Sequence, residues 1–325
     1  MNRSIIFISL LFSFFIRLHA VDDSIYRDEA KRFLSSMPEN LQNIQTEAVR
    51  RAIAGDCKAL DAVRNSRNVP PELPDGVSRI DINDTLALFR DSRYKDVVTP
   101  LLVYFHGGGW TFGSINSCSC YCAAVASSGV TVLAVNYRLA PEQGFPAGLD
   151  DCIYAAKVAL DSLGKWNCSS VALGGDSSGG NLAIATAMSF PADTFSSLVL
   201  FYPVTKAFAD NSPSWEKYGS GYGLDSGLML AFNEAYTTDV HNPLVSPACA
   251  ADHRLSMLPP VLMISADHDI LKCQGNEFVM RLKELAVEVE YRVIPSTVHL
   301  FITVPGQPSA FRESVERSSR FILSH

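Results

Sequence analysis

The chain has few basic residues for its length and no run of Lys or Arg. Its 325 residues include 27 Lys and Arg against 34 Asp and Glu, which gives a formal net charge of −7 with His neutral. A nucleic-acid-binding protein needs a basic face to neutralise phosphates. The charge balance therefore argues against a nucleic-acid partner, and against polyanionic partners in general.

Motifs that hold phosphates or metal ions are also missing. The glycine-rich stretches have neither the Gly-Lys-Ser/Thr ending of a phosphate-binding loop nor the Gly-x-Gly-x-x-Gly spacing of a dinucleotide site. Cys118, Cys120 and Cys122 stand close together, but without paired Cys-x-x-Cys spacing or His residues at zinc spacing. We expect neither a cofactor nor a metal ion.

The apolar run at the start of the chain is too short to span a bilayer. Residues 5–16 are almost all apolar, about a dozen residues against the roughly 20 of a membrane-spanning helix. Arg3 precedes the run and Ala20 follows it, which is typical of a secretory signal peptide over residues 1–20. We expect an exported mature chain without stable membrane insertion; an uncleaved anchor is the alternative. In an oxidising compartment the eight cysteines permit up to four disulfides, whose pairing the sequence does not reveal.

What the chain does have is a serine between glycines, directly after a short apolar run. The run Val171–Leu173 leads into Gly175-Asp176-Ser177-Ser178-Gly179 and then into a helix-like segment. A serine on a sharp strand-to-helix turn has strained backbone angles, and glycines two positions away on each side let neighbouring backbone approach. The pattern predicts that Ser177 is a nucleophile, with Asp176 bracing the turn; an ordinary glycine turn is the alternative.

A second glycine-rich segment lies upstream. The strand-like run Leu101–Phe105 ends in His106-Gly107-Gly108-Gly109. Attack on an ester carbonyl creates an oxyanion, and each donor already aimed at that oxygen lowers the barrier by roughly 3–4 kcal/mol. We predict that the backbone amides of Gly107, Gly108 and Ser178 form this oxyanion hole.

A serine nucleophile needs a base and a carboxylate that orients the base. His299 lies in a loop just after the strand-like segment 289–294, where a sheet would present a base. The acid should follow the preceding strand, 261–265, and there Asp267 and Asp269 compete. Position in the loop favours Asp269, which stands farther from the strand.

Together these motifs resemble the hormone-sensitive-lipase-like esterases of the α/β-hydrolase fold, a group similar to arylacetamide deacetylases and plant carboxylesterases. The resemblance extends from about Leu101 to the C-terminus, and it also rests on the segments 136–142, 145–147 and 150–151. It implies that Asp269, which opens an Asp-Pro-Leu-like segment, is the acid and that His299, in a His-Gly-Phe-like segment, is the base. Ile270 and Leu300 depart from the family pattern beside these two residues.

The pattern of apolar runs predicts an α/β fold with a mostly parallel central sheet and helices on both faces. Two alternating segments near 77–82 and 86–90 suggest an antiparallel start, and continuous apolar runs follow at 101–105, 130–135, 171–173, 198–202, 261–264 and 289–294. Helices are expected at 24–36, 40–54, 117–128, 149–162, 179–189, 274–285 and 309–323. We expect one domain over 21–325, with helical cap elements from about 21–70 and 204–247.

The function that these residues favour is a serine esterase acting on short-chain, acetyl-type carboxylic esters through an acyl-enzyme. An amidase or formamidase with the same triad is one alternative. A ligand-binding receptor that keeps the fold without catalysis is another. Arg138 and Glu142 are expected to form structural salt bridges rather than to take part in the chemistry. The partner is a small-molecule ester, and the oligomeric state is left open.

Overall fold

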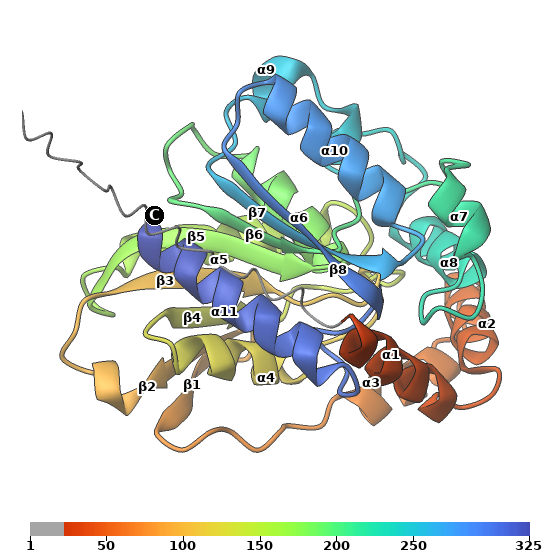
Figure 1. Cartoon of the computed structure of the whole chain (residues 1–325), viewed down its shortest axis with the longest axis horizontal. Coiled ribbons are helices and arrows are strands. Elements are labelled where there is room, and N and C mark those ends of the chain that lie inside the picture. Colours follow the sequence, from red (N-terminus) through yellow and green to blue (C-terminus); the bar gives the residue numbers. More distant parts are fainter. Residues whose placement is uncertain (1–22) are drawn as a thin grey trace, which may run out of the picture.

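An eight-stranded sheet organises the computed structural model, which describes residues 23–325 (Figure 1). The strands are β1 (Val77–Asn83), β2 (Leu86–Asp91), β3 (Thr99–Phe105), β4 (Thr131–Val135), β5 (Cys168–Asp176), β6 (Leu198–Phe201), β7 (Val261–His268) and β8 (Val289–Val298). Their order is β1-β2-β4-β3-β5-β6-β7-β8. β2 runs antiparallel to β1 and β4, and the remaining neighbours are parallel. The predicted α/β-hydrolase fold is confirmed.

Helices separate most of the strands. The α-helices are α1 (Ser24–Ser36), α2 (Leu41–Ile53), α3 (Lys58–Arg67), α4 (Ile115–Ala126), α5 (Ala147–Asp161), α6 (Ser178–Ala187), α7 (Pro213–Lys217), α8 (Ser226–Tyr236), α9 (Asp252–Leu255), α10 (Lys272–Glu284) and α11 (Pro308–Ser324). Short 3-10 turns occupy Ser92–Tyr94 and Pro247–Cys249. All seven expected helices are present, and their ends differ from the predicted ones by one or two residues at most.

Two layers of helices cover the sheet. α1, α4 and α11 lie on one face, and α5, α6 and α10 lie on the other (Figure 1). Each layer buries its own apolar cluster against the strands. β3 to β7 are buried on both faces over most of their length. This two-sided burial explains why these strands read as continuous apolar runs rather than alternating ones.

Several local features differ from the sequence-based expectations. α3 was not predicted, because Leu60 is its only fully buried residue and the helix has no continuous apolar face. β2 is almost entirely buried rather than exposed on one face, since it lies between β1 and β4 and packs against α4. β7 and β8 both continue several residues beyond their apolar runs, as far as His268 and Val298.

The segments predicted to form a cap lie together beyond the carboxyl ends of the parallel strands. α2 packs on α3 and on α8, so N-terminal residues meet the segment 204–247 there (Figure 1). The division of the chain into one domain with cap elements stays a prediction. The predicted signal peptide, residues 1–20, lies outside the described residues. Within residues 23–325, no helix combines the length and the apolarity that a membrane crossing requires.

The crossing of β3, β5 and α6 is the most crowded place in the fold. A Cβ atom added to Gly179 would lie 2.0 Å from the carbonyl oxygen of Phe105. One added to Gly175 would lie 2.4 Å from the backbone of Gly179. Glycine is therefore required at both positions for close approach of three backbone segments, as the motif predicted.

We expect Gly179→Ala to destabilise the fold strongly. The atom that its methyl group would meet belongs to the backbone of a central strand and cannot move aside, so the loss should reach at least about 3 kcal/mol. The comparison is Gly164→Ala, where a Cβ would meet no atom within 4 Å, and where the change should stay within about 0.5 kcal/mol. Urea unfolding of both variants measures this, and equal stabilities would contradict the crowding argument.

Candidate active site

Ser177 stands on a tight turn between β5 and α6. Its backbone adopts φ 53° and ψ −119°, which lies in the left-handed half of conformational space. Its amide donates to the carbonyl oxygen of Phe201 on β6 at 2.9 Å, and its carbonyl accepts from Asn181 and Val204. These bonds hold the strained turn and present the hydroxyl at the carboxyl edge of the sheet. Ser177 is 6% exposed.

The register of β7 and β8 brings an acid and a histidine together. His268 pairs with Val298 at the end of these parallel strands. The next residue on each chain is therefore Asp269 on one side and His299 on the other. The two side chains become neighbours because both strands extend further than their apolar runs.

Asp269, His299 and Ser177 form a continuous chain of contacts. His299 Nδ1 lies 2.6 Å from Asp269 Oδ2, and His299 Nε2 lies 3.1 Å from Ser177 Oγ. With Nδ1 protonated, the ring donates to the carboxylate and Nε2 accepts from the hydroxyl. Asp269 and His299 are each 1% exposed. The structure thus brings together the three side chains that the sequence singled out.

Asp267, the competing aspartate, serves another purpose. Its carboxylate accepts from Lys272 Nζ at 2.6 Å and from the Ser296 amide at 3.1 Å. It lies on β7 itself, and its side chain holds the strand β8 and the start of α10 rather than the imidazole of His299.

The oxyanion-hole prediction needs one correction. The amide of Gly107 donates to the carboxylate of Asp176 at 3.0 Å, so it is already occupied and does not face the cavity. Gly108 and Gly109 line the cavity beside Ser177, with φ 124° and 60°, and their amides have no hydrogen-bond acceptor within residues 23–325. Ser178 opens α6, so its amide has no partner inside the helix. The amides that remain open beside Ser177 are those of Gly108, Gly109 and Ser178 rather than that of Gly107.

Asp176 braces the turn, as expected, through the glycine loop. Besides the Gly107 amide, its carboxylate accepts from the hydroxyl of Tyr104 at 2.9 Å. Burial raises the pKa of Asp176 to about 6, against the opposing effect of these two hydrogen bonds. One buried carboxyl group thus ties β3, the glycine loop and the residue before Ser177 together.

Two residues that sequence reasoning missed hold the His299 loop. The ring of Tyr202 lies 4.3 Å from that of His299, and its hydroxyl accepts from the Ile302 amide. Gln307 donates to the carbonyls of Val298 and His299 and accepts from the Val298 amide. Tyr202 reaches this loop from just after β6, 100 residues before Ile302, and Gln307 from eight or nine residues later than the groups it binds. No local sequence motif marks either of them.

The cavity over Ser177 is small, about 30 Å³. Its lining combines residues from the glycine loop, the N-terminal helices and the segment 204–247: Gln42, Gln45, Arg67, Gly108, Gly109, Phe112, Ser177, Gly223, Leu224, Leu228, Phe232, His299 and Leu300. Trp110 is buried and stacks on Tyr236 at 4.4 Å, as part of the core.

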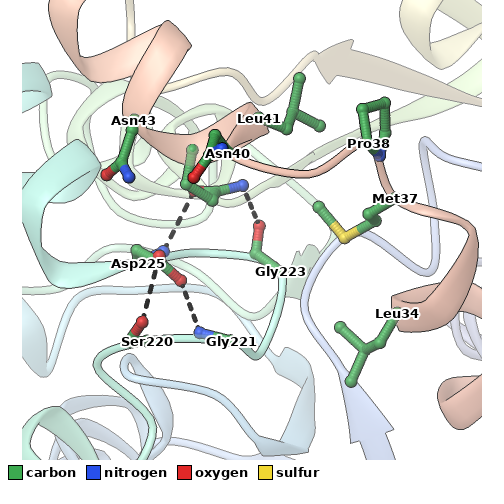
Figure 2. Close-up of a pocket in the computed structure, with 11 residues that line it drawn as sticks. Leu34, Met37, Pro38, Asn40, Leu41, Asn43, Ser220, Gly221, Gly223 and Asp225 are labelled. Atoms are coloured by element: carbon green, nitrogen blue, oxygen red, sulfur yellow. Dashed lines mark hydrogen bonds between the residues drawn. The ribbon is translucent and has the colours of Figure 1, made fainter.

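A larger outer pocket of about 280 Å³ lies next to this cavity, between α1, α2 and the loop 220–225 (Figure 2). Gln42 lines both spaces. Its side chain donates to the Gly223 carbonyl at 2.8 Å and accepts from the Asp225 amide at 3.2 Å. Asp225 in turn holds Ser220 and Gly221 (Figure 2). The amide of Gln42 therefore closes part of the wall between the outer pocket and the inner cavity.

The remaining candidate residues are structural. Arg138 pairs with Asp151 at 2.9 Å, and Glu142 pairs with Arg64 at 2.6 Å, as salt bridges. All eight cysteines are free thiols in the structure. Among residues 23–325, no group of three or more His, Cys, Asp or Glu is arranged to hold a metal ion.

Comparison with known proteins agrees with this geometry. Residues 102–303 match the family described as having the alpha/beta hydrolase fold. The chain belongs to this family. The match includes the glycine loop, Ser177, Asp269 and His299, and it agrees with the resemblance noted in the sequence.

Several relatives are named as ester hydrolases. The chain is 35% identical over 241 residues to an arylesterase of Saccharolobus solfataricus, covering 68% of this chain and 74% of that protein. It is 36% identical over 212 residues to an ethyl acetate hydrolase of Pseudomonas putida, covering 62% and 65%. The chain thus spans about two thirds of the length of the curated relatives it matches. A solved mutant of the esterase rPPE superposes with a TM-score of 0.76 at 22% identity, covering 93% of this chain and 97% of that one, which shows the shared fold.

The buried ring of His106 gives a pH-dependent contribution to stability. Its Nδ1 lies 2.9 Å from the Gly107 carbonyl, and its ring stacks on Tyr137 at 4.3 Å. Burial lowers the pKa of His106 to about 4. The unfolded chain takes up this proton near pH 6.5, so the folded state loses stability as pH falls from about 6.5 to 4, by up to about 3 kcal/mol.

We therefore expect the stability advantage of the wild-type protein over His106→Asn to shrink by about this amount between pH 7 and pH 4. Urea unfolding at several pH values measures the difference. Asp176→Asn is the matched control, with the opposite expected trend. Because the pKa of Asp176 is raised, its burial costs less at low pH, so the stability advantage of wild type over Asp176→Asn should grow as pH falls. Parallel pH profiles for wild type and His106→Asn would contradict the assignment.

Proposed function

We propose that this protein is a carboxylic ester hydrolase for short-chain, acetyl-type esters. One observation supports this above the others: an unbroken chain of contacts from Asp269 through His299 to Ser177, next to backbone amides without acceptors. The named activities of the relatives agree with it. Export of the mature chain belongs to the same proposal and rests on the sequence of residues 1–20 alone.

The proposed reaction has two halves. Ser177 Oγ attacks the ester carbonyl while His299 Nε2 takes the hydroxyl proton, and the Asp269 carboxylate stabilises the imidazolium. The amides of Gly108, Gly109 and Ser178 receive the oxyanion. His299 then gives its proton to the leaving alcohol, so the C–O bond breaks and an acyl-enzyme remains. Water, deprotonated by His299, attacks the acyl group and restores Ser177 with release of the acid.

The preference for short acyl groups follows from the size of the cavity. The cavity of about 30 Å³ is much smaller than the outer pocket of about 280 Å³, and this small size favours a short acyl group such as an acetyl group. Leu224, Leu228 and Phe232 line it and limit longer chains.

The complete hydrogen-bonded triad argues against the receptor alternative, which has no need of a histidine in contact with Ser177. The amidase alternative uses the same triad. Comparing the hydrolysis of acetyl esters with that of N-formyl aromatic amides separates it from the proposed esterase.

We expect Ser177→Ala to lower kcat on p-nitrophenyl acetate by about 10⁴-fold or more, because the nucleophile is lost while the fold remains. The exposed Ser35 on α1 supplies the control: Ser35→Ala should keep wild-type activity. A fluorophosphonate probe should label the wild type and the control but not Ser177→Ala. Full activity or labelling in Ser177→Ala would refute the proposed mechanism.

We expect Gln42→Ala to extend hydrolysis to esters with longer acyl chains. The substitution removes the amide that separates the inner cavity from the outer pocket, so longer chains gain space. The ratio of kcat/KM for p-nitrophenyl hexanoate to that for the acetate should rise by about tenfold, the usual effect of a methylene or two in an apolar site. Asn43→Ala is the matched control, since Asn43 lines only the outer pocket. An equal change in both variants would argue against a separating wall.

A further inference from the structure

One permanent charge lies at the cavity over Ser177. Arg67, the last residue of α3, lines this cavity, and the described lining includes no Asp or Glu. The protein as a whole carries a formal charge of −7. A single guanidinium beside the reacting serine therefore stands out against an acidic protein.

Arg67 has no counter-ion. Within residues 23–325 its guanidinium makes no hydrogen bond and no ion pair, and it lies over the face of Phe112, 5.7 Å from the ring centroid. Arg64, one turn earlier, pairs instead with Glu142 and Asp61. Burial lowers the pKa of Arg67, but a guanidinium stays protonated at neutral pH.

The position of Arg67 is fixed by its helix. Arg64 Nε donates to the Thr111 carbonyl at 2.8 Å, and its Nη2 donates to the Ala140 carbonyl at 2.9 Å. These bonds hold α3 against the loop that follows Gly108 and Gly109. Arg67 lies one turn further along the same helix and so points at the same loop.

A structural role explains this placement poorly. A cation near a helix C-terminus is favourable, but Arg50 and Arg51 serve α2 in this way from exposed positions. A charge that is partly withdrawn from water loses favourable hydration free energy. Without a hydrogen-bond or ion-pair partner, this loss is not offset. An anion in the cavity would supply the missing partner.

Gln45 gives a second, independent indication. Its side chain lines the same cavity and is 3% exposed, yet its amide makes no hydrogen bond within the described residues. No described protein group satisfies this amide, so it is open to a group bound in the cavity. Together, Gln45 and Arg67 offer N–H donors to the cavity that the glycine loop also lines.

From these contacts we infer that Arg67 is a specificity-determining residue that binds a carboxylate on the substrate, with Gln45 as a second donor. The inference rests on the proposed function and narrows its substrate class to short esters that carry a carboxylate close to the ester bond. The planar guanidinium fits the two oxygens of a carboxylate. Such a substrate leaves neither Arg67 nor Gln45 without a partner.

The test uses pairs of small esters that differ only in charge. Monoethyl succinate and ethyl succinamate place the group on the acyl side, and acetoxyacetate and acetoxyacetamide place it on the alcohol side. Hydrolysis is followed by titration of the released acid. Wild type should prefer the carboxylate in at least one pair. Arg67→Met should lower kcat/KM for that carboxylate by about 10- to 100-fold, mainly through KM, since a hydrogen bond to a charged group contributes on this scale.

The neutral amides should change by no more than about twofold in Arg67→Met. Arg67→Lys should keep part of the preference for the carboxylate ester, because it keeps the positive charge but loses the planar guanidinium that can bind both carboxylate oxygens. Arg50→Gln removes one exposed positive charge elsewhere and should leave both members of each pair unchanged. An equal loss on carboxylate and amide, or an unchanged ratio, would overturn the inference.

Binding separates this inference from the proposed activity. In the Ser177→Ala background, succinate should bind more tightly than succinamide by calorimetry, and Arg67→Met should abolish the difference. Equal binding of the two in Ser177→Ala overturns the role of Arg67 even if the esters are hydrolysed. Selective succinate binding by a wild-type protein that hydrolyses no ester would instead refute the proposed function and leave the anion site standing.

Discussion

The backbone of Ser177 is the constraint on which the rest of the structure depends. A non-glycine residue in the left-handed region costs of the order of 1–3 kcal/mol and persists only where its surroundings enforce it. Here Gly179 lies against the Phe105 carbonyl, and the Ser177 amide is bound to Phe201. Three neighbouring strands thus hold one strained turn. Without their close packing the hydroxyl would not stand at the edge where β7 and β8 end.

Two parts of the chain contribute different residues around this turn. The sheet supplies the chemistry, since β5, β7 and β8 each end at one member of the triad and β3 ends at the glycine loop. The N-terminal helices supply side chains that reach over it, among them Gln42, Gln45 and Arg67. The proposed reacting groups and the residues that line the cavity above them therefore come from different segments of the chain.

Much of the fold and the reacting residues could be predicted from local pattern. Buried parallel strands are continuous apolar runs, so each run after Leu101 marked a strand. Ser177 was recognisable because the turn requires glycine two positions before and after the serine, and Gly175 and Gly179 are visible there in the sequence. Asp269 and His299 were singled out by their positions after strand-like runs, and the resemblance supported both. The choice of Gly107 as an oxyanion donor was wrong, because the sequence does not show that Asp176 accepts from the Gly107 amide.

By itself, the sequence determined the layered sheet and the strained serine turn, since each depends on neighbours a few positions away. The residue pattern left Asp267 and Asp269 in competition, and the resemblance favoured Asp269. The tertiary structure places Asp269 against His299, because His268 pairs with Val298 across two strands. It alone brought Gln45 and Arg67 to Ser177, more than a hundred residues away in the chain. Contacts between distant segments come from packing, and no local pattern records them.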